Sequence, residues 1–514
     1  MKRSTLRSVQ AIWVLIVLIV ITTKPLVAKD QEIRIAVPGD IQTLNTLEMK
    51  NGNDIPVILH MHDILLRSNP ITGEKEIKNS LSESLEMLPN NKSIKIRLRR
   101  DVKFHTGDPL TAHDVKFTYM QCLNPRNANL VAHQLNTIEK IDVIDDYNLI
   151  IHLWEPYAGW KHILWVGIAS KKYYERVGRE TFRRKPVGSG PFRFVEHKTG
   201  EYTLLEANPN YHLGPPKYKY LRFMIIPDET SRIAMLETGA VDLVDHISPH
   251  FVRRLNTRNN VVVKRTDRIP SLFYLTAKVN VFPILKDRKF CHAIQHAINR
   301  QEIVDRVFFG EGYPLYTWAS KYEIGFDPSL NFEYNPDKAR ELLKQSTYKP
   351  GTPIQLTFTN AISNANLIGM VIQKYLQNVG ITVKLQQLEA GVAATYYRNN
   401  DPRIGHMNIG SSPGSPDPSV RLRNTIHSRS KWNSYRDRPR QKELDTLIDG
   451  QNDEMNEARR ISMLKRIHQI LMEDGAGAAL FGLNLIYAHS DRIDYTWWGT
   501  SIKPYGLARI QIVK

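Results

Sequence analysis

A strand, a helix and a second strand follow one another between residues 354 and 385, and this order constrains the fold more than any other feature. Residues 354–358 (IQLTF) form a short β-rich run, and residues 364–378 repeat apolar side chains at helical spacing. Gly380 stands where a helix commonly ends, and residues 381–385 alternate apolar and polar side chains. The sequence therefore predicts a right-handed βαβ unit with parallel strands.

The same alternation of helices and strands recurs along the chain. A helix is predicted over residues 228–238, ended by Gly239 and followed by a strand at 241–244. Asn335 and Pro336 form a helix start, and a long amphipathic helix is predicted from about 454 to 472. With 514 residues, the chain is too long for one compact domain. We predict an α/β fold built as several lobes.

The first 28 residues are typical of an export signal rather than of folded structure. Lys2, Arg3 and Arg7 precede a short apolar run at 11–21, and the small residue Ala28 comes before a polar boundary. The apolar run is shorter than the roughly 20 residues that a membrane-spanning helix needs. We predict a secretory signal peptide cleaved after Ala28, with an uncleaved anchor as the alternative. No cysteine lies near this point, which argues against a lipid-anchored lipoprotein.

The chain is strongly basic. Its formal net charge is +18, which falls to +14 when the signal peptide and its four basic residues are removed. Such an excess attracts nucleic acids, anionic membranes or acidic ligands, but export argues against nucleic acid. The densest basic stretch, residues 421–442, lacks regular aromatic residues and is more typical of a solvated face than of a ligand site. The charge favours an anionic or zwitterionic ligand.

Residues 410–414 (GSSPG) formally match the G-x-S-x-G motif of serine hydrolases. In a nucleophile elbow, the residue after the serine donates a backbone N–H to the oxyanion. Here that residue is Pro413, which has no N–H, and the SPDP that follows is a poor helix start. A Gly/Pro/Ser loop is therefore favoured over a catalytic Ser412, and a secreted serine hydrolase is kept as the alternative from another functional class.

Patterns for metals and nucleotides are incomplete. His292 and His296 are four residues apart on a predicted helix, but the glutamate of HExxH is missing. His60 and His62 would share a face on a strand, yet two ligands make no site. No GxGxxG or Walker A loop is present in the sequence. We predict no metal site, no cofactor and no catalytic residue.

The two cysteines, Cys122 and Cys291, exclude a disulfide-dense scaffold and a cysteine-ligated iron–sulfur cluster. Because they are assigned to different lobes, free buried thiols are favoured over a disulfide. An exported, multi-lobed α/β protein without a visible reactive centre suits the capture of a ligand in a cleft between lobes.

Residues 98–119 (LRRDVKFHTGDPLTAHDVKFTY) resemble the signature LR-x-x-V-K-F-x-x-G-x-P-x-T-A-x-D-V of the family 5 extracellular solute-binding proteins. These are the peptide-, oligopeptide- and nickel-binding components of ABC importers. Further stretches resemble the family in the same order: PVGSGPFRFVE at 186–196, ANPNYHLGPP at 207–216, ETSRIAMLETGAVDLV at 229–244, FCHAIQHAINRQEIV at 290–304, YNPDKARELLKQSTY at 334–348 and QKYLQNVGITVKLQQLE at 373–389. The resemblance covers nearly all of the mature chain.

The resemblance implies a periplasmic-binding-protein-like fold of two α/β lobes joined by a hinge, one of them with an extra subdomain. Lobe I would comprise residues 29–60, 185–268 and 480–514, its subdomain residues 61–184, and lobe II residues 269–479. The lobes would close around a solute, and the closed form would meet an ABC transporter permease in the inner membrane. We expect a monomeric, non-enzymatic protein in the periplasm.

In the peptide-binding relatives, a loop resembling W-x-x-D-x-x-D-P supplies an aspartate for the peptide's α-amino group. Here the loop is GSSPGSPDP at 410–418: Asp417 and Pro418 match its end, while Gly414 stands at the amine-anchoring position. A buried ammonium needs a partner, and this loop lacks the usual one. We expect a peptide or peptide-like solute, with a metal chelate, an opine or another anionic small solute as the alternative.

The resemblance also implies candidate ligand contacts, each with an ordinary loop or core role as the alternative. They are Ser411, Ser412 and Gly414 on the cleft wall of lobe II, Tyr274 in an aromatic-rich region, Phe481 near the return strand, and Arg421 and Arg423 as partners of an anionic group.

Overall fold

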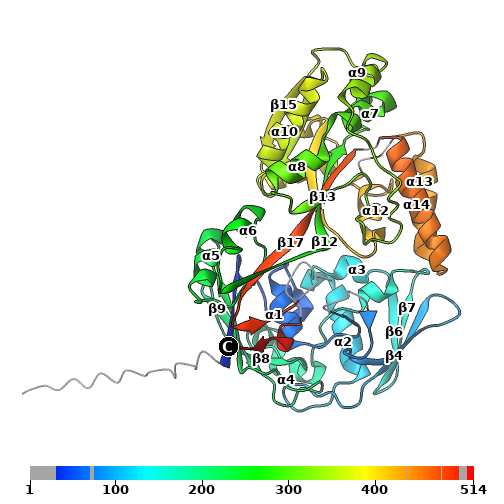
Figure 1. The fold of residues 1–514 in the computed structure, drawn as a ribbon. Coiled ribbons are helices and arrows are strands. Elements are labelled where there is room, and N and C mark those ends of the chain that lie inside the picture. The colour runs from blue at the N-terminus through cyan, green and yellow to red at the C-terminus, as the bar shows by residue number, and fades with distance from the viewer. Residues whose placement is uncertain (1–30, 70–74, 434, 436, 476, 497–505) are drawn as a thin grey trace, which may run out of the picture.

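The computed structural model describes residues 31–69, 75–433, 435, 437–475, 477–496 and 506–514. Within them, the chain forms two lobes stacked one on the other, which confirms the predicted two-lobed α/β fold (Figure 1). The lower lobe in this view holds both ends of the described chain, and the upper lobe holds its middle. The predicted signal peptide at 1–28 lies outside the described residues.

One sheet runs through both lobes. Its strand order is β15-β14-β16-β12-β17-β11-β1-β10-β9-β8, and β13 pairs with β17 off this path. The strands of the lower lobe are β1 (Glu32–Val37), β8 (Phe192–Lys198), β9 (Tyr202–Ala207), β10 (Tyr220–Ile225) and β11 (Leu243–Val244). Those of the upper lobe are β13 (Gly312–Pro314), β14 (Ile354–Thr359), β15 (Val383–Leu388) and β16 (Met407–Pro413).

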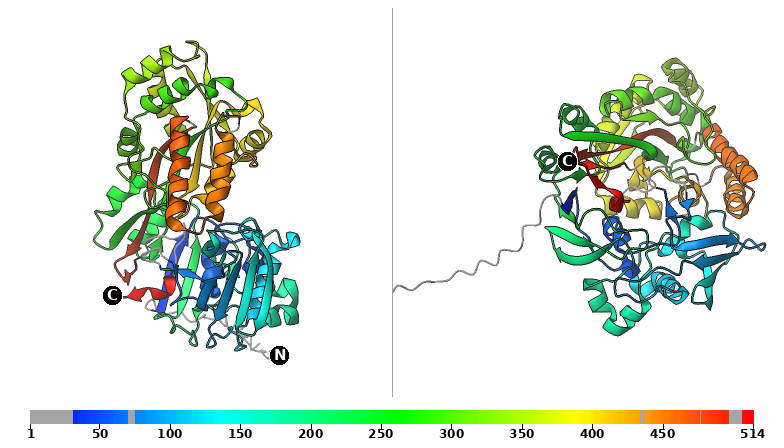
Figure 2. Two further views of the ribbon diagram at one scale, coloured as in Figure 1. Left: turned by 90° about the vertical axis from the view of Figure 1, so that its right-hand side faces the viewer. Right: turned by 60° about the horizontal axis from the view of Figure 1, so that its bottom comes forward.

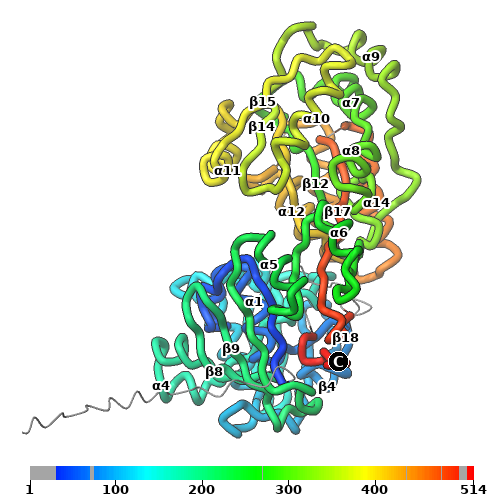
Figure 3. The backbone as a smooth tube through the Cα atoms, turned by 60° about the vertical axis from the view of Figure 1, so that its left-hand side comes forward, coloured from blue at the N-terminus to red at the C-terminus, as the bar shows by residue number. Residues whose placement is uncertain are grey.

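Two long strands, β12 (Val261–Ala277) and β17 (Ala478–Ser490), belong to both lobes and link them, as Figures 1 and 3 show. They pair antiparallel, but their register shifts between Thr266 and Ser271. An interrupted ladder resists bending less than a continuous one. A second shift follows between Phe273 and Tyr274, so the pairing of the two linking strands is locally irregular.

The lower lobe carries a second, four-stranded sheet in the order β4-β5-β7-β6. Its strands are β4 (Ser82–Met87), β5 (Ser93–Leu98), β6 (Ile138–Asp145) and β7 (Asn148–Leu153). Ile96 and Ile151 of this sheet belong to the same buried cluster as Ile33 of β1 and Leu221 of β10. The two sheets of the lower lobe therefore share one hydrophobic core.

Helices cover both lobes. In the lower lobe they are α1 (Asp54–Met61), α2 (Ala112–Leu123), α3 (Ala132–Leu135), α4 (Lys171–Arg184), α5 (Glu229–Glu237) and α6 (Pro249–Leu255). In the upper lobe they are α7 (Arg288–Ala297), α8 (Arg300–Val307), α9 (Pro336–Lys344), α10 (Ala365–Asn378), α11 (Ala390–Asn399), α12 (Ser419–Thr425), α13 (Gln441–Asp453) and α14 (Glu457–Glu473). The core of the upper lobe includes Phe290 of α7, Ile372 of α10 and Leu356 of β14.

Short elements complete the described chain. The two-residue strands are β2 (Arg67–Ser68), β3 (Lys75–Glu76), β18 (Ile493–Asp494) and β19 (Gln511–Ile512). The 3-10 turns are η2 (Thr46–Glu48), η3 (Pro125–Asn127), η4 (Trp160–Ile163), η5 (Pro283–Lys286), η6 (Pro402–Ile404) and η7 (Leu507–Arg509). None of the helices in the described part combines the length and the apolar character that crossing a bilayer requires.

The predicted βαβ unit is present. β14, α10 and β15 follow in order, and the two strands are parallel, with Ile354 opposite Val383. The helices predicted at 228–238 and 454–472 correspond to α5 and α14. Asn335 caps α9 as predicted, because its side chain accepts a hydrogen bond from the backbone N–H of Lys338.

Both cysteines are free and buried, as predicted. Cys122 lies in the core of the lower lobe and Cys291 in that of the upper lobe. Burial raises the pKa of the Cys122 thiol to about 12 and also raises that of Cys291. Both thiols are therefore protonated at neutral pH, and the thiolate is the reactive form.

We expect the native protein to react only slowly with Ellman's reagent and the denatured protein to release two equivalents per chain. The measurement is absorbance after mixing with the reagent, with and without guanidinium. Fast labelling of the native protein, or fewer than two thiols in denaturant without reductant, would contradict this assignment.

Candidate ligand site between the two lobes

The strand directions point six carboxyl ends into the space between the lobes. β12 runs from the lower to the upper lobe, so β16, antiparallel to it, runs back toward the lower lobe, and β14 and β15 are parallel to β16. β17 also runs downward, so its antiparallel neighbour β11, and β1 and β10 with it, run toward the upper lobe. Ligands of open α/β sheets bind outside the carboxyl ends of the strands. We call the residues at these six ends the interlobe site.

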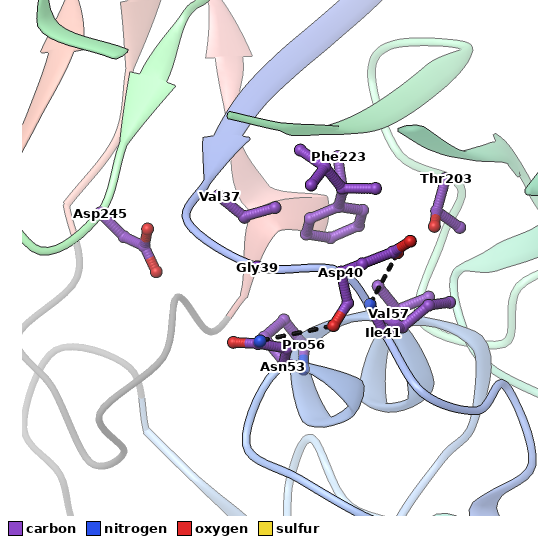
Figure 4. Close-up of a pocket in the computed structure, with 11 residues that line it drawn as sticks. Val37, Gly39, Asp40, Ile41, Asn53, Pro56, Val57, Thr203, Phe223 and Asp245 are labelled. Atoms are coloured by element: carbon purple, nitrogen blue, oxygen red, sulfur yellow. Dashed lines mark hydrogen bonds between the residues drawn. The ribbon is translucent and has the colours of Figure 1, made fainter. Parts of the chain in front are cut away.

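The lower wall of the interlobe site contains a small recess at the ends of β1 and β10 (Figure 4). Val37, Ile41 and Phe223 make it apolar. The recess has room for about one or two water molecules. The recess can therefore hold one small group of a ligand but not a whole peptide.

A tight backbone turn forms the edge of this recess. A Cβ on Gly39 would stand 2.5 Å from Asn53 Nδ2, so a larger residue there would have to displace that side chain. Asn53 Nδ2 donates to the backbone oxygen of Asp40 at 3.4 Å. The Asp40 carboxylate accepts from the backbone N–H groups of Ile41 at 2.7 Å and Gly200 at 2.8 Å. Asp40 thus fixes the turn with its own hydrogen bonds.

The upper wall is the end of β16, where three of the predicted contacts lie together. Ser411 is exposed and Ser412 is half-buried, opposite Phe273 and Leu272 of β12. Gly414 donates its backbone N–H to Pro270 O at 2.8 Å, and a Cβ there would stand 2.9 Å from Pro270 Cδ. The contact with Pro270 therefore explains the glycine without any ligand.

The two predicted aromatic contacts occupy different environments. Tyr274 lies beneath the β16 wall and packs on Trp318, with ring centroids 4.9 Å apart. Burial raises the pKa of Tyr274, and the neighbouring Ser412 hydroxyl and Arg421 partly offset this. Phe481 is fully buried in the core of the upper lobe, where its ring stacks on Phe273 at 4.9 Å. The structure therefore brings Tyr274 to the serines and separates Phe481 from them.

The two predicted arginines also lie in different environments: Arg421 is paired with a carboxylate, and Arg423 is exposed. Arg421 donates to Glu323 through Nη1 at 2.9 Å and through Nη2, and its Nε donates to Trp318 O at 3.1 Å. Its guanidinium is occupied by a buried carboxylate. Arg423 is exposed and has neither a hydrogen bond nor an ion pair among the described residues. Of the two, Arg423 is the one with charge to offer a ligand.

Glu323 is a site residue that the sequence did not reveal. Its Oε1 accepts from the backbone N–H of Ser415 at 3.0 Å, and its Oε2 accepts from that of Ser320 at 3.1 Å. Together with Arg421, these bonds fasten the 414–417 loop to the body of the upper lobe. Glu323 lies 92 residues from Ser415 in the sequence, and no local pattern links them.

Asp417 supplies the carboxylate of the predicted ligand loop, and this carboxylate already has partners within the protein. Arg460 Nη2 donates to Asp417 Oδ2 at 2.6 Å, and Ser419 donates its backbone N–H at 2.9 Å. His162 Nε2, from the lower lobe, lies 3.9 Å from Asp417 Oδ2. Burial would raise the pKa of Asp417, but Arg460 and His162 hold it below its usual value. An ammonium would compete with Arg460 for this carboxylate.

The histidines singled out in the sequence make structural hydrogen bonds. His292 Nε2 and His296 Nδ1 lie 2.9 and 2.8 Å from the backbone oxygens of Glu473 and Glu333. His60 and His62 lie at the end of α1 rather than on a strand, and they bond to backbone oxygens of that helix. Within the described ranges, no three His, Cys, Asp or Glu side chains are grouped closely enough to hold a metal ion.

Two solute-binding proteins of known name are similar to this chain in sequence. Oligopeptide-binding protein AppA of Bacillus subtilis is 30% identical over 348 residues, and the alignment covers 62% of each chain. Glutathione-binding protein GsiB of Salmonella choleraesuis is 27% identical over 326 residues, covering 62% of this chain and 63% of the relative. The alignments therefore span less than two thirds of these relatives' length.

Solved structures share the whole fold. NikA of Brucella suis, solved in complex with Fe(III)-EDTA, matches with a TM-score of 0.84 at 21% identity, covering 94% of this chain and 100% of that chain. AppA of Bacillus subtilis, solved with a nonapeptide, matches with a TM-score of 0.75 at 22% identity, covering 94% and 99%.

A model of the bacterial extracellular solute-binding proteins, family 5, matches residues 76–432, which is more than half of the chain. The matched segment contains the signature at 98–119, the βαβ unit and the β16 wall. The resemblance seen in the sequence is therefore confirmed, and the chain belongs to the family 5 bacterial extracellular solute-binding proteins.

Proposed function

We propose that this chain captures a peptide or peptide-like solute between its two lobes and delivers it to the permease of an ABC transporter. The facing carboxyl ends of the two sets of strands carry the proposal, because a solute bound there touches both lobes at once. The names of the relatives support it, since AppA is an oligopeptide-binding and GsiB a glutathione-binding protein.

Capture works through a hinge motion. A solute that contacts both walls of the interlobe site binds the closed arrangement more tightly than the open one, so it shifts the population toward closure. We propose a hinge at the register shift of β12, with lobe I at 29–60, 185–268 and 480–514, its subdomain at 61–184 and lobe II at 269–479. We also propose a monomer, exported to the periplasm after cleavage following Ala28, that releases its solute chemically unchanged.

A metal chelate, an opine or another anionic small solute is the second candidate. One observation favours it: the amine-anchoring position is Gly414, and the nearby Asp417 already pairs with Arg460. The solved complex of NikA with Fe(III)-EDTA supports such a ligand for this fold.

A serine hydrolase is the least supported candidate. Ser412 lies within a strand, β16, and the next residue, Pro413, has no N–H for an oxyanion. A fluorophosphonate probe should leave the native protein unlabelled, with Ser412→Ala as the control. Labelling of the wild type that disappears in Ser412→Ala would support the hydrolase.

Peptide binding should raise the melting temperature of the mature chain. A solute at 100 times its Kd adds about 2.7 kcal/mol to the free energy of unfolding by mass action. The measurement is differential scanning fluorimetry with a tryptic digest of casein, followed by native mass spectrometry of the complex. Stabilisation by a nickel–histidine chelate or an opine, with no response to the digest, would replace the peptide by the second candidate.

A further inference from the structure

The two lobes also touch each other away from the linking strands β12 and β17. The backbone N–H of Ala158, between β7 and η4 of the lower lobe, donates to Asn452 O at the end of α13 at 2.6 Å. Further along the same loop, His162 Nε2 lies 3.9 Å from Asp417 Oδ2 of the upper lobe. In Figure 2, the orange helices α13 and α14 reach down to the blue and cyan strands of the lower lobe, and Figure 1 shows them apart from the crossing of β12 and β17. The lobes are therefore joined at two separate places.

Met455 adds an apolar contact between the lobes. It lies in the short turn between α13 and α14 of the upper lobe, and its half-buried side chain packs against the hydrophobic core of the lower lobe. No other apolar residue of the upper lobe within the described ranges packs against this core. Tyr157, next to Ala158 in the sequence, belongs to the same core. Separating the lobes would therefore expose the apolar surface of Met455 to water, which is unfavourable.

Each half of this contact is held in place by its own lobe. In the upper lobe, Asn452 is 3% exposed, and its Nδ2 donates to Ile448 O at 2.9 Å. Gln451 Nε2 donates to Asn452 Oδ1 at 2.8 Å. In the lower lobe, a Cβ on Gly159 would stand 2.7 Å from the Tyr157 ring, so this ring lies directly against the backbone of the loop. Two ordered surfaces therefore meet here, and the contact is made wholly of protein groups.

We infer that Ala158, Asn452 and Met455 form a clasp that holds the two lobes together before a solute arrives. The inference goes beyond the proposed function, because it concerns the unliganded protein. In a hinged protein without a clasp, the solute alone supplies the free energy of closure by touching both lobes. Here the burial of Met455 and the hydrogen bond of Ala158 supply part of it, so closed protein is populated without solute.

A clasp also controls how fast a captured solute leaves. A solute enclosed by both lobes escapes only when they separate, so every interaction that favours closure slows its release. Met455 and Ala158 lie outside the strand ends that define the interlobe site. Loosening the clasp should therefore speed release without changing the walls of that site.

Amide hydrogen exchange of the unliganded protein tests the clasp without any solute. If the lobes must separate before water reaches the Ala158 N–H, its exchange rate follows the fraction of open protein. The Ala158 amide should therefore exchange slowly in the wild type. Met455→Asp places a charge against the core of the lower lobe and should speed this exchange about 10-fold. An Ala158 amide that exchanges as fast as in an unstructured peptide, or equally fast in both proteins, overturns the clasp.

Two further variants test whether the effect belongs to this contact. Met370→Asp makes the same substitution on α10, where the side chain is 56% exposed, and should leave the exchange of Ala158 unchanged. Met455→Ala removes the apolar contact without adding a charge and should speed the exchange about threefold. It replaces Met455→Asp if that variant shows no cooperative melting transition. Equal acceleration by Met370→Asp would report general instability rather than opening of the lobes, and would overturn the clasp.

A tryptic casein digest separates the clasp from the proposed function. If the digest raises the melting temperature while the Ala158 amide is unprotected, the clasp is wrong and capture of peptides stands. If the amide responds to the variants as expected and the digest has no effect, the clasp stands and capture of peptides falls. Where the digest binds, native mass spectrometry after dilution should show release about 10-fold faster from Met455→Asp than from Met370→Asp. Equal release rates would overturn the role of the clasp in retaining a solute.

Discussion

Replacing Asp63 with leucine is expected to lower the free energy of unfolding by about 3–5 kcal/mol, because it leaves buried partners of a carboxylate behind. Asp63 is 1% exposed. It accepts hydrogen bonds from Arg67 Nη2 at 2.9 Å, Tyr211 OH at 3.0 Å and Ser189 Oγ at 3.0 Å. His212 Nε2 lies 3.3 Å away, so one side chain fastens segments up to 149 residues apart.

Urea denaturation followed by circular dichroism measures this loss. Ser189→Ala is the matched control, since it removes one hydroxyl from the same carboxylate and should cost about 1 kcal/mol. Equal losses in Asp63→Leu and Ser189→Ala would show that the charge network contributes little.

Asp63 also predicts a pH dependence. Burial would raise its pKa, but His212 and Arg67 hold it well below its usual range. A carboxylate whose pKa is depressed in the folded state stabilises above its unfolded pKa, and the contribution is lost as the pH falls through the folded value. The difference in free energy of unfolding between the wild type and Asp63→Asn should therefore be constant from pH 8 to about 4. Below pH 4 the difference should become smaller. A gap that narrows already near pH 6 would contradict the assignment.

Glu323→Ala is expected to be the second most damaging change, again by about 3–5 kcal/mol, because Arg421 would remain buried without its counter-charge. The side chains of Arg421 and Glu323 are 8% and 0% exposed. The loss also frees the backbone N–H of Ser415, so the 414–417 loop should loosen and ligand binding should weaken with stability.

A double variant distinguishes the effect of an unpaired buried charge from the effect of the lost Glu323 side chain itself. Glu323→Leu with Arg421→Met removes both charges at once and should recover most of the lost stability, since hydrophobic replacements of buried pairs are often tolerated. Stability is measured by urea denaturation, and loop order by hydrogen exchange at 414–417. A double variant as unstable as Glu323→Ala would show that the hydrogen bonds of Glu323 to Ser320 and Ser415 matter more than the ion pair.

The sequence was a good guide where the signal is local. The 3.6-residue period of α10 and the alternation of β15 lie within about 30 residues of each other, and both elements form as predicted. Pro413 argues against a nucleophile elbow from the sequence alone, since folding cannot supply the N–H that proline lacks. The long match at 98–119 correctly indicated the family and therefore the fold.

The interlobe site was harder to predict because its determinants are distant in sequence. Glu323 carries no motif, and its role follows only from the placement of Ser415 and Arg421 around it. Phe481 lies on β17, whose residues are buried on both faces, so alternation could not indicate which side chains face the core. Arg421 and Arg423 look alike in the sequence, and only the packing of Glu323 distinguishes them.

The paired strands β12 and β17 have a consequence for how such proteins diversify. The chain enters the upper lobe along one strand and leaves it along the other, and Leu275 and Ala478 are ladder partners. The stretch from 278 to 477 is thus a continuous insertion with adjacent ends, the arrangement in which one domain is readily spliced into another. Exchanging this segment between relatives would replace the upper lobe of the molecule and keep the lower one. New solute preferences could then arise by recombination rather than by gradual substitution.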